Sequence, residues 1–234
     1  MKITWYGQAC FRLEGESNGK RLSIVTDPYT PEKAGYPPVP QPADVVVTSS
    51  VTDDFHDRED LVPGEHVHVN ALEVADNGGL FDLVKLGFPI GIEAVEAAEA
   101  DLHPSGHPDR NALYAFRLDG MRVAHMGDVG NPLSKRQTDF LRDTDVLLAL
   151  AGGFPTIPLP ELMKVIEEVR PRLVIPMHFR TLSYRPRNIA WLPAFLRLFG
   201  EERTDFACAA TAEITRESLP DETRMLVIDY VRPA

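Results

Sequence analysis

The sequence predicts an α/β fold, and three observations indicate it. The N-terminal part consists of short apolar runs separated by turn residues, a pattern typical of strands. The C-terminal part carries apolar residues at helical spacing, followed directly by a buried-strand pattern. The chain has 234 residues, of which 44% are hydrophobic, so it can bury one sizeable core. We therefore expect a single domain over residues 1–234.

The first half of the chain reads as one sheet. An Asn-Gly pair at 18–19 is a hairpin signal between two apolar runs, and residues 43–47 form a buried-strand run. The Pro-rich stretch 30–42 cannot be helical, so we expect a surface loop near the mouth of a site. His66 and His68 alternate with valines, as residues on one face of a strand do, and need no ligand role.

The second half predicts helix–strand units. Five apolar residues between 159 and 169 fall at helical spacing, and residues 173–176 then read as a buried strand that delivers His178 at its end. A second amphipathic helix is expected at 189–199. An apolar run at 225–231 closes a sheet near the C-terminus. The apolar stripes of these helices are core positions.

Composition excludes several classes of function. The formal net charge of −11 argues against a nucleic-acid partner, because phosphate binding relies on a basic face. Cys10 and Cys208 are far apart and indicate neither a disulfide framework nor a cysteine metal site, which fits a reducing cytoplasm. The chain opens without a leader pattern and has no apolar run of membrane-spanning length. We expect a soluble, cytoplasmic protein with a small-molecule substrate and no membrane partner, and a homo-oligomer stays open.

The stretch 48–57 is the most informative part of the chain. It follows the buried strand at 43–47, so its polar side chains emerge at the C-terminal end of a strand, where sites on sheets usually form. Three later segments add single candidates for metal binding, namely His103, Asp128 and His178.

These segments together resemble the metallo-β-lactamase superfamily, in particular the branch of small bacterial metal-dependent hydrolases similar to L-ascorbate-6-phosphate lactonase. Besides the loop, the resemblance rests on the opening hairpin at 1–13, the Asp-Pro turn at 27–28 and the segments 100–106, 123–128 and 174–179. It implies a four-layer αββα sandwich and a metal-dependent hydrolase.

The metal loop of that family reads Thr-His-x-His-x-Asp-His. Its four ligand positions are occupied in this chain by Ser49, Val51, Asp53 and Asp54. Only the aspartate is retained, and Gln8 likewise stands where the opening hairpin usually has histidine. The resemblance therefore implies a degenerate metal site.

The family's ligand sets, carried onto this chain, leave one usable site. The first site would keep His103 and the bridging Asp128, and should be empty or very weak because a catalytic zinc needs three protein ligands. The second would keep a mononuclear set, Asp53, Asp54, Asp128 and His178. The implied cofactor is one divalent metal ion, Zn, Mn or Fe, with oxygen-rich ligands moving the preference away from zinc.

The expected reaction is hydrolysis of a small ester, lactone or phosphoester. Asp53 and Asp128 are the catalytic candidates: Asp53 would orient or deprotonate the attacking water, and Asp128 is the bridging carboxylate. Arg180 and Arg185 follow His178 in a loop and are candidates for clamping an anionic substrate. Arginines on a loop are more often solvated surface residues.

Other interpretations stay open. The gaps at Ser49 and Val51 favour a non-catalytic protein that binds a small ligand in the same fold. A redox enzyme with iron in an oxygen-rich site is permitted by the ligands. His56 and Asp57 are reserve donors close to the loop, and His125 is expected to orient Asp128 without binding metal itself.

Overall fold

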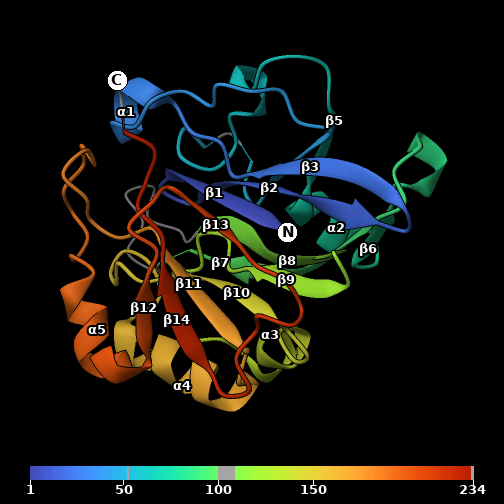
Figure 1. Cartoon of the computed structure of the whole chain (residues 1–234). Helices are drawn as coiled ribbons and strands as arrows, with labels where there is room; N and C mark the ends of the chain where they lie inside the picture. The colour runs from blue at the N-terminus through green and yellow to red at the C-terminus, as the bar shows by residue number, and fades with distance from the viewer. Residues whose placement is uncertain (52, 100–108, 233–234) are drawn as a thin grey trace.

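The computed structural model describes residues 1–51, 53–99 and 109–232, and its centre is a pair of β-sheets (Figure 1). The six-stranded sheet has the order β13-β1-β2-β3-β4-β5. Its strands are β1 (Lys2–Gly7), β2 (Cys10–Ser17), β3 (Lys20–Thr26), β4 (Val45–Thr48), β5 (Val67–Asn70) and β13 (Thr211–Glu213).

The second sheet has eight strands in the order β12-β14-β11-β10-β9-β8-β7-β6. Its strands are β6 (Leu80–Asp82), β7 (Gly91–Ala98), β8 (Arg110–Leu118), β9 (Met121–His125), β10 (Val146–Leu150), β11 (Leu173–Met177), β12 (Thr204–Phe206) and β14 (Arg224–Val227). The strands β9, β10, β11, β14 and β12 run parallel to one another, whereas β6, β7 and β8 join antiparallel.

Helices complete an α/β sandwich, as the resemblance implied. They are α1 (Pro31–Ala34), α2 (Ala71–Asp76), α3 (Lys135–Phe140), α4 (Leu159–Val169) and α5 (Pro193–Phe199), with 3₁₀ turns η1 (Glu59–Leu61), η2 (Val84–Leu86) and η3 (Glu201–Arg203). Figure 1 shows α3, α4 and α5 on the side of the eight-stranded sheet that faces away from the other sheet. The short α2 packs on β7 and β8 and also contacts β4 and β5, so it bridges the two sheets.

Local sequence explains the elements that position the site. The Asn-Gly turn joins β2 to β3 as expected, and both of its residues have positive φ, 46° at Asn18 and 80° at Gly19. The strands β10 and β11 are buried along their whole length, which accounts for their unbroken apolar runs. The amphipathic α4 buries five residues against the sheet and ends at Arg170, whose φ of 52° is left-handed.

Three expected elements differ in extent. The Pro-rich stretch does contain a helix, the single turn α1, because Pro31 stands at a first-turn position where no backbone N–H is required. The helix expected from residue 189 begins at Pro193. The terminal strand ends at Val227, and the chain then crosses to the other sheet, where the Val231 N–H donates to the Trp5 carbonyl at 2.9 Å.

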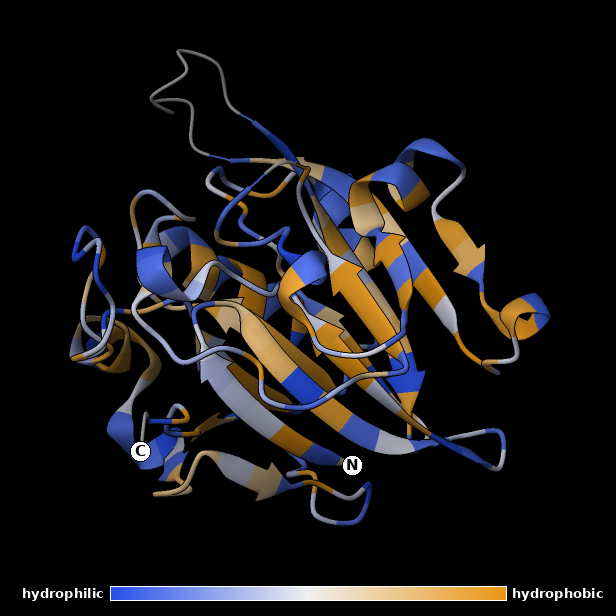
Figure 2. Ribbon diagram, turned by 90° about the horizontal axis from the view of Figure 1, so that it is seen from above, coloured by the Kyte–Doolittle hydropathy of each residue, from blue (hydrophilic) through white to orange (hydrophobic). Residues whose placement is uncertain are grey.

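One cluster of buried hydrophobic residues extends from Met1 to Tyr230 and includes residues of both sheets. Figure 2 shows apolar residues along the strands and hydrophilic ones in the connecting turns. Among the helices that the structure describes, none is long and apolar enough to cross a membrane. The carboxyl ends of β9 and β11 lie at the same end of their sheet, since both strands run parallel to β10.

Candidate metal centre

Polar side chains that follow three strands converge where the carboxyl ends of β9 and β11 lie. Asp128 follows β9, His178 follows β11, and the segment 49–57 follows β4 of the other sheet. His178 Nε2 lies 3.3 Å from Asp128 Oδ1, and His56 Nδ1 lies 3.6 Å from Asp128 Oδ2. The two imidazole rings are stacked, with centroids 5.4 Å apart and an interplanar angle of 11°. The carboxylate of Asp128 therefore stands between two histidines.

The position of His178 is fixed by the backbone conformation of the turn after β11. Its φ is 50°, a left-handed value that a non-glycine residue adopts only when its surroundings enforce it. Its N–H donates to the Gln8 carbonyl at 2.9 Å, which ties it to the turn between β1 and β2. A Cβ at Gly152 would lie 2.1 Å from the His178 carbonyl oxygen, so only glycine allows this approach.

His56 is held by Asp53. Its Nδ1 donates to Asp53 Oδ2 at 2.6 Å, and Asp53 Oδ1 also accepts from the backbone N–H of Phe55 at 2.8 Å. The His56 side chain is buried. A carboxylate bonded to one imidazole nitrogen fixes the ring and leaves its other nitrogen for a metal.

Two overlapping groups of donor atoms could hold a metal ion. Among the described residues, one group comprises His56, Asp128 and His178 and the other Asp53, Glu99 and Asp128, and in each the donor atoms lie within 4.8 Å of one another. Asp128 belongs to both groups. Two imidazoles and up to three carboxylates thus surround one region, a donor set that suits Zn, Mn or Fe.

Several polar atoms in this region are buried without a hydrogen-bond partner among the described residues. They are Gln8 Oε1, His56 Nε2, Asp128 Oδ1 and His178 Nδ1. Buried polar atoms in native proteins are nearly always paired, so four unpartnered atoms on residues that contact one another indicate a ligand that the protein atoms do not supply. The donor set therefore fits a divalent metal ion.

The electrostatics of the centre favour a cation. Burial alone would lower the pKa of His56, but the charges of Asp128 and Asp53 raise it well above its ordinary value. Burial raises the pKa of Asp128 to about 7, against the lowering effect of His56. Burial and the positive His56 lower the pKa of His178 to about 3. The carboxylates thus stabilise one positive charge here, which a proton on His56 or a metal ion can provide.

Asp27 holds the start of the loop that follows β4 through a hydrogen bond with Ser49. It is fully buried, its Oδ2 accepts from Ser49 Oγ at 2.6 Å, and its Oδ1 accepts from the Tyr114 hydroxyl at 3.1 Å. Burial raises the pKa of Asp27 to about 7, partly offset by the charge of His56. The hydroxyl of Ser49 is thereby engaged with Asp27, at a position where the family has a ligand.

The structure brings together three of the sequence-predicted ligands and places Asp54 elsewhere. Asp53, Asp128 and His178 share the centre, whereas Asp54 belongs to neither donor group of the described residues. Asp54 faces outward, where its Oδ1 accepts from Thr30 Oγ1 at 2.8 Å and its Oδ2 pairs with Lys33. These contacts lower the pKa of Asp54. His103 lies outside the described residues.

His56 takes the place in the centre that the family pattern assigned to position 54. Only its nearness to the loop in sequence hinted at this, since it stands two residues past the last ligand position of the motif. Val51, at the second lost histidine position, is 51% exposed and offers no donor atom. His125 uses both of its nitrogens, with Nε2 donating to the Ala9 carbonyl and Nδ1 accepting from the Gly127 N–H, each at 2.9 Å. It shapes the turn that leads to Asp128.

The arginines expected to clamp a substrate point elsewhere in this structure. The guanidinium of Arg180 lies over the Trp191 ring, 4.9 Å from its centroid, and that of Arg185 donates to the Glu32 carbonyl. Tyr184 of the same loop lies nearer the centre, with its ring 6.5 Å from that of His178, and its hydroxyl donates to Asn188 Oδ1 at 3.1 Å. Burial, followed by the charge of Asp128, raises the pKa of Tyr184, so its hydroxyl stays a hydrogen-bond donor.

Comparison with known proteins shows the family of the chain. A family model described as the beta-lactamase superfamily domain matches residues 2–178. An Archaeoglobus fulgidus protein named UPF0173 metal-dependent hydrolase is 26% identical over 202 residues, covering 77% of this chain and 84% of that protein. A Pyrococcus furiosus protein of the same name is 28% identical over 233 residues, covering 86% and 93%.

Solved structures show the same fold. A Thermotoga maritima protein assigned to the zinc-dependent hydrolases of the metallo-β-lactamase superfamily superposes with a TM-score of 0.72 and 29% identity, over 98% of this chain and 99% of its own. Igni18, a metallo hydrolase from Ignicoccus hospitalis, gives 0.60 and 20% identity over 84% and 89%, which concerns the fold alone. These relatives support the superfamily and do not single out the L-ascorbate-6-phosphate lactonase branch.

Proposed function

The chain belongs to the beta-lactamase superfamily, and from that membership we propose that it is a hydrolase with one divalent metal ion held by His56, Asp128 and His178. The observation that carries the proposal is the convergence of two buried imidazoles on one carboxylate, together with unpartnered nitrogen and oxygen atoms on these same three residues. The relatives named metal-dependent hydrolases support it.

Each residue of the centre has a distinct role in this proposal. A divalent metal bound there supplies the Lewis acidity for attack of water on an ester, lactone or phosphoester. Asp53 orients His56 through their 2.6 Å hydrogen bond, and it is our candidate to receive a proton from the attacking water. Tyr184 is our candidate to donate a hydrogen bond to an oxygen of the substrate, which would replace its present acceptor, Asn188 Oδ1.

The types of donor atom support a choice of metal. With Asp54 the set would hold three carboxylates and one imidazole, but with His56 in its place the set gains a second imidazole. Nitrogen donors suit zinc and iron, whereas an all-oxygen set favours harder ions such as magnesium. We propose zinc, with manganese or iron as the alternatives.

A second candidate function is a small-ligand-binding protein that no longer turns its ligand over. The specific observation in its favour is the loss of donors at two family positions, where Ser49 is bonded to Asp27 and Val51 is exposed. A hydrolase would hold a metal tightly and convert its substrate to product. A binding protein would leave its ligand unchanged, with or without a metal.

Metal content tests the proposal directly. Protein purified without chelator or affinity-tag metal is analysed by mass spectrometry, reloaded with zinc, manganese or iron, and assayed on aryl ester, lactone and phosphodiester substrates. About one metal per chain with metal-dependent turnover is the expected result. Tight metal without turnover of any substrate favours the binding protein, and no metal under any condition overturns both the site and the hydrolase. Tyr184→Phe should raise KM or lower kcat while leaving the metal content unchanged.

A further inference from the structure

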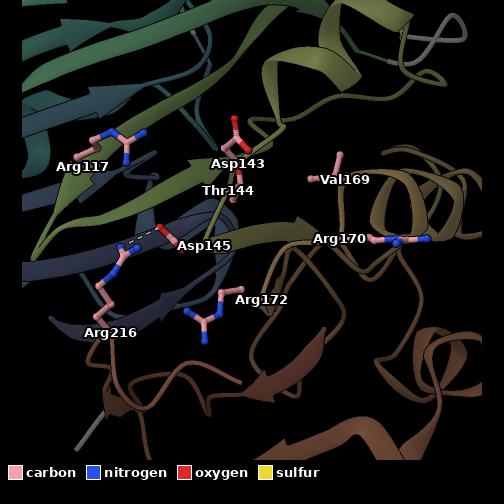
Figure 3. A pocket seen from close by; sticks show the side chains of 8 residues that line it. All are labelled: Arg117, Asp143, Thr144, Asp145, Val169, Arg170, Arg172 and Arg216. Atoms are coloured by element: carbon pink, nitrogen blue, oxygen red, sulfur yellow. Dashed lines mark ion pairs between the residues drawn. The ribbon is translucent and has the colours of Figure 1, made fainter. Parts of the chain in front are cut away.

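A hollow of about 400 Å³ lies at one end of the eight-stranded sheet, and Figure 3 shows its lining. Part of the lining comes from the residues directly before β10 and β11, which are at the opposite strand ends from the metal-centre residues Asp128 and His178, since these follow β9 and β11. The lining residues are Arg117, Asp143, Thr144, Asp145, Val169, Arg170, Arg172 and Arg216. Four of the eight are arginines, in a chain whose formal net charge is −11.

These arginines are poorly neutralised by the protein. Among the described residues, the nearest carboxylate oxygen lies 3.7 Å from Arg172, on Asp221, and 3.9 Å from Arg216, on Asp145. Arg117 makes no ion pair with any described residue. By contrast, Arg142 and Arg224 each pair with a carboxylate at 2.9 Å. The hollow therefore keeps an excess of positive charge.

Two of the guanidinium groups are fixed by backbone carbonyls. Arg172 donates through Nε to the Pro220 carbonyl and through Nη2 to the Leu219 carbonyl, both at 2.8 Å. Arg216 donates to the Gly120 carbonyl, also at 2.8 Å. Neutral acceptors hold these side chains in place without cancelling their charge. The entropy cost of ordering them when a ligand binds is therefore small.

The arrangement of the groups points to their ligand. Figure 3 shows the guanidinium groups of Arg117, Arg172 and Arg216 around Asp145, while that of Arg170 points away. Asp145 is itself engaged, because its Oδ2 accepts from the Arg122 N–H at 2.8 Å. Guanidinium groups that come from different elements suit an anion with several charged oxygens spread in space, as a phosphate group has.

We propose that this hollow binds the phosphate group of free inorganic phosphate or of a small phosphorylated molecule, independently of the metal centre. Arg117, Arg172 and Arg216 are its ligands. A volume of about 400 Å³ admits a small molecule beyond the phosphate itself. The site is separate from the proposed hydrolase centre, and either assignment can stand without the other.

Isothermal titration of the protein as purified tests the site, with inorganic phosphate in one series and glycerol 2-phosphate in another, at constant ionic strength. The expected result is saturable binding that weakens as potassium chloride is raised. Arg117→Gln should weaken binding about tenfold, the effect of losing one charge-assisted hydrogen bond. Tighter binding of glycerol 2-phosphate than of inorganic phosphate would identify a phosphorylated molecule as the ligand, and the reverse order would identify free phosphate.

Two matched variants separate the outcomes. Arg197→Gln removes the same charge from an exposed position on α5 outside the hollow and should leave binding unchanged. His178→Ala alters the metal centre and should also leave phosphate binding intact. Binding that is lost in His178→Ala but retained in Arg117→Gln would assign the phosphate to the metal centre and overturn the proposal, as would equal weakening by Arg117→Gln and Arg197→Gln.

Discussion

The metal centre is built from two kinds of structure that constrain their residues differently. Asp128 follows β9 and His178 follows β11, the two strands that pair with β10 in the parallel part of the sheet. Strand register there fixes which face each side chain occupies. His56 comes from the loop after β4, which is held by a few side-chain contacts such as the one between Ser49 and Asp27. In such a loop, the ligand residue can stand at a different sequence position and its side chain can still reach the metal centre. At a strand end, a change of sequence position would point the side chain away from the centre.

Removing the strand-end histidine is expected to have the largest effect. His178→Ala deletes a donor whose position the turn after β11 enforces. Metal affinity should fall by more than the about 10–100-fold loss typical of residues that only support a ligand. Competition with a chromophoric chelator measures the affinity. His66→Ala removes a histidine outside the centre and is the control, and equal affinities for the two variants would exclude His178 as a ligand.

The loop histidine should matter almost as much. His56→Ala removes the second imidazole and leaves Asp53 without its partner, so metal affinity should fall by at least about 100-fold. The sharper test is to add Asp54→His to this variant, which restores histidine at the family position. Partial recovery of affinity would show that the loop can present its donor from either position. No loss on His56→Ala alone would contradict the role given to this residue.

Metal binding should strengthen as the pH rises. The pKa of His56 is raised by its carboxylate neighbours, so the imidazole carries a proton at neutral pH that a metal ion must displace. Affinity then increases about tenfold per pH unit for each proton displaced, until the pH passes the pKa of His56. Calorimetry in buffers of different ionisation enthalpy counts the released protons. A pH-independent affinity between pH 6 and 8 would exclude His56 as a protonated competitor.

The same contrast explains how much the sequence could predict. The α/β class and several of its strands followed from apolar runs and turn signals, because buried strands such as β10 and β11 and the hairpin at Asn18 leave direct patterns, whereas the four-layer sandwich was implied by the family resemblance. The resemblance also named Asp128 and His178, and a recognisable strand before each residue fixed their place in the alignment.

The loop could not be read in the same way. A motif aligned position by position assigns Asp54 to the centre, but the path of a loop depends on contacts that no local pattern reveals. Here Asp54 turns outward to Thr30 and Lys33, and His56 turns inward to Asp53. The sequence also did not reveal the arginine-lined hollow, because its residues come from four separate segments of the chain.

The smallest effect is expected for the carboxylate that the motif placed in the centre. Asp54→Ala should leave metal affinity unchanged, because Asp54 belongs to neither donor group of the described residues. Its loss removes exposed contacts with Lys33 and Arg58, and such surface pairs contribute at most about 1 kcal/mol to the free energy of unfolding. Chelator competition and thermal unfolding measure the two quantities, with Asp60→Ala as the control for removal of an exposed carboxylate from the same loop. A fall in metal affinity close to that of His56→Ala would instead return Asp54 to the ligand set and show that the loop takes a different path when metal binds.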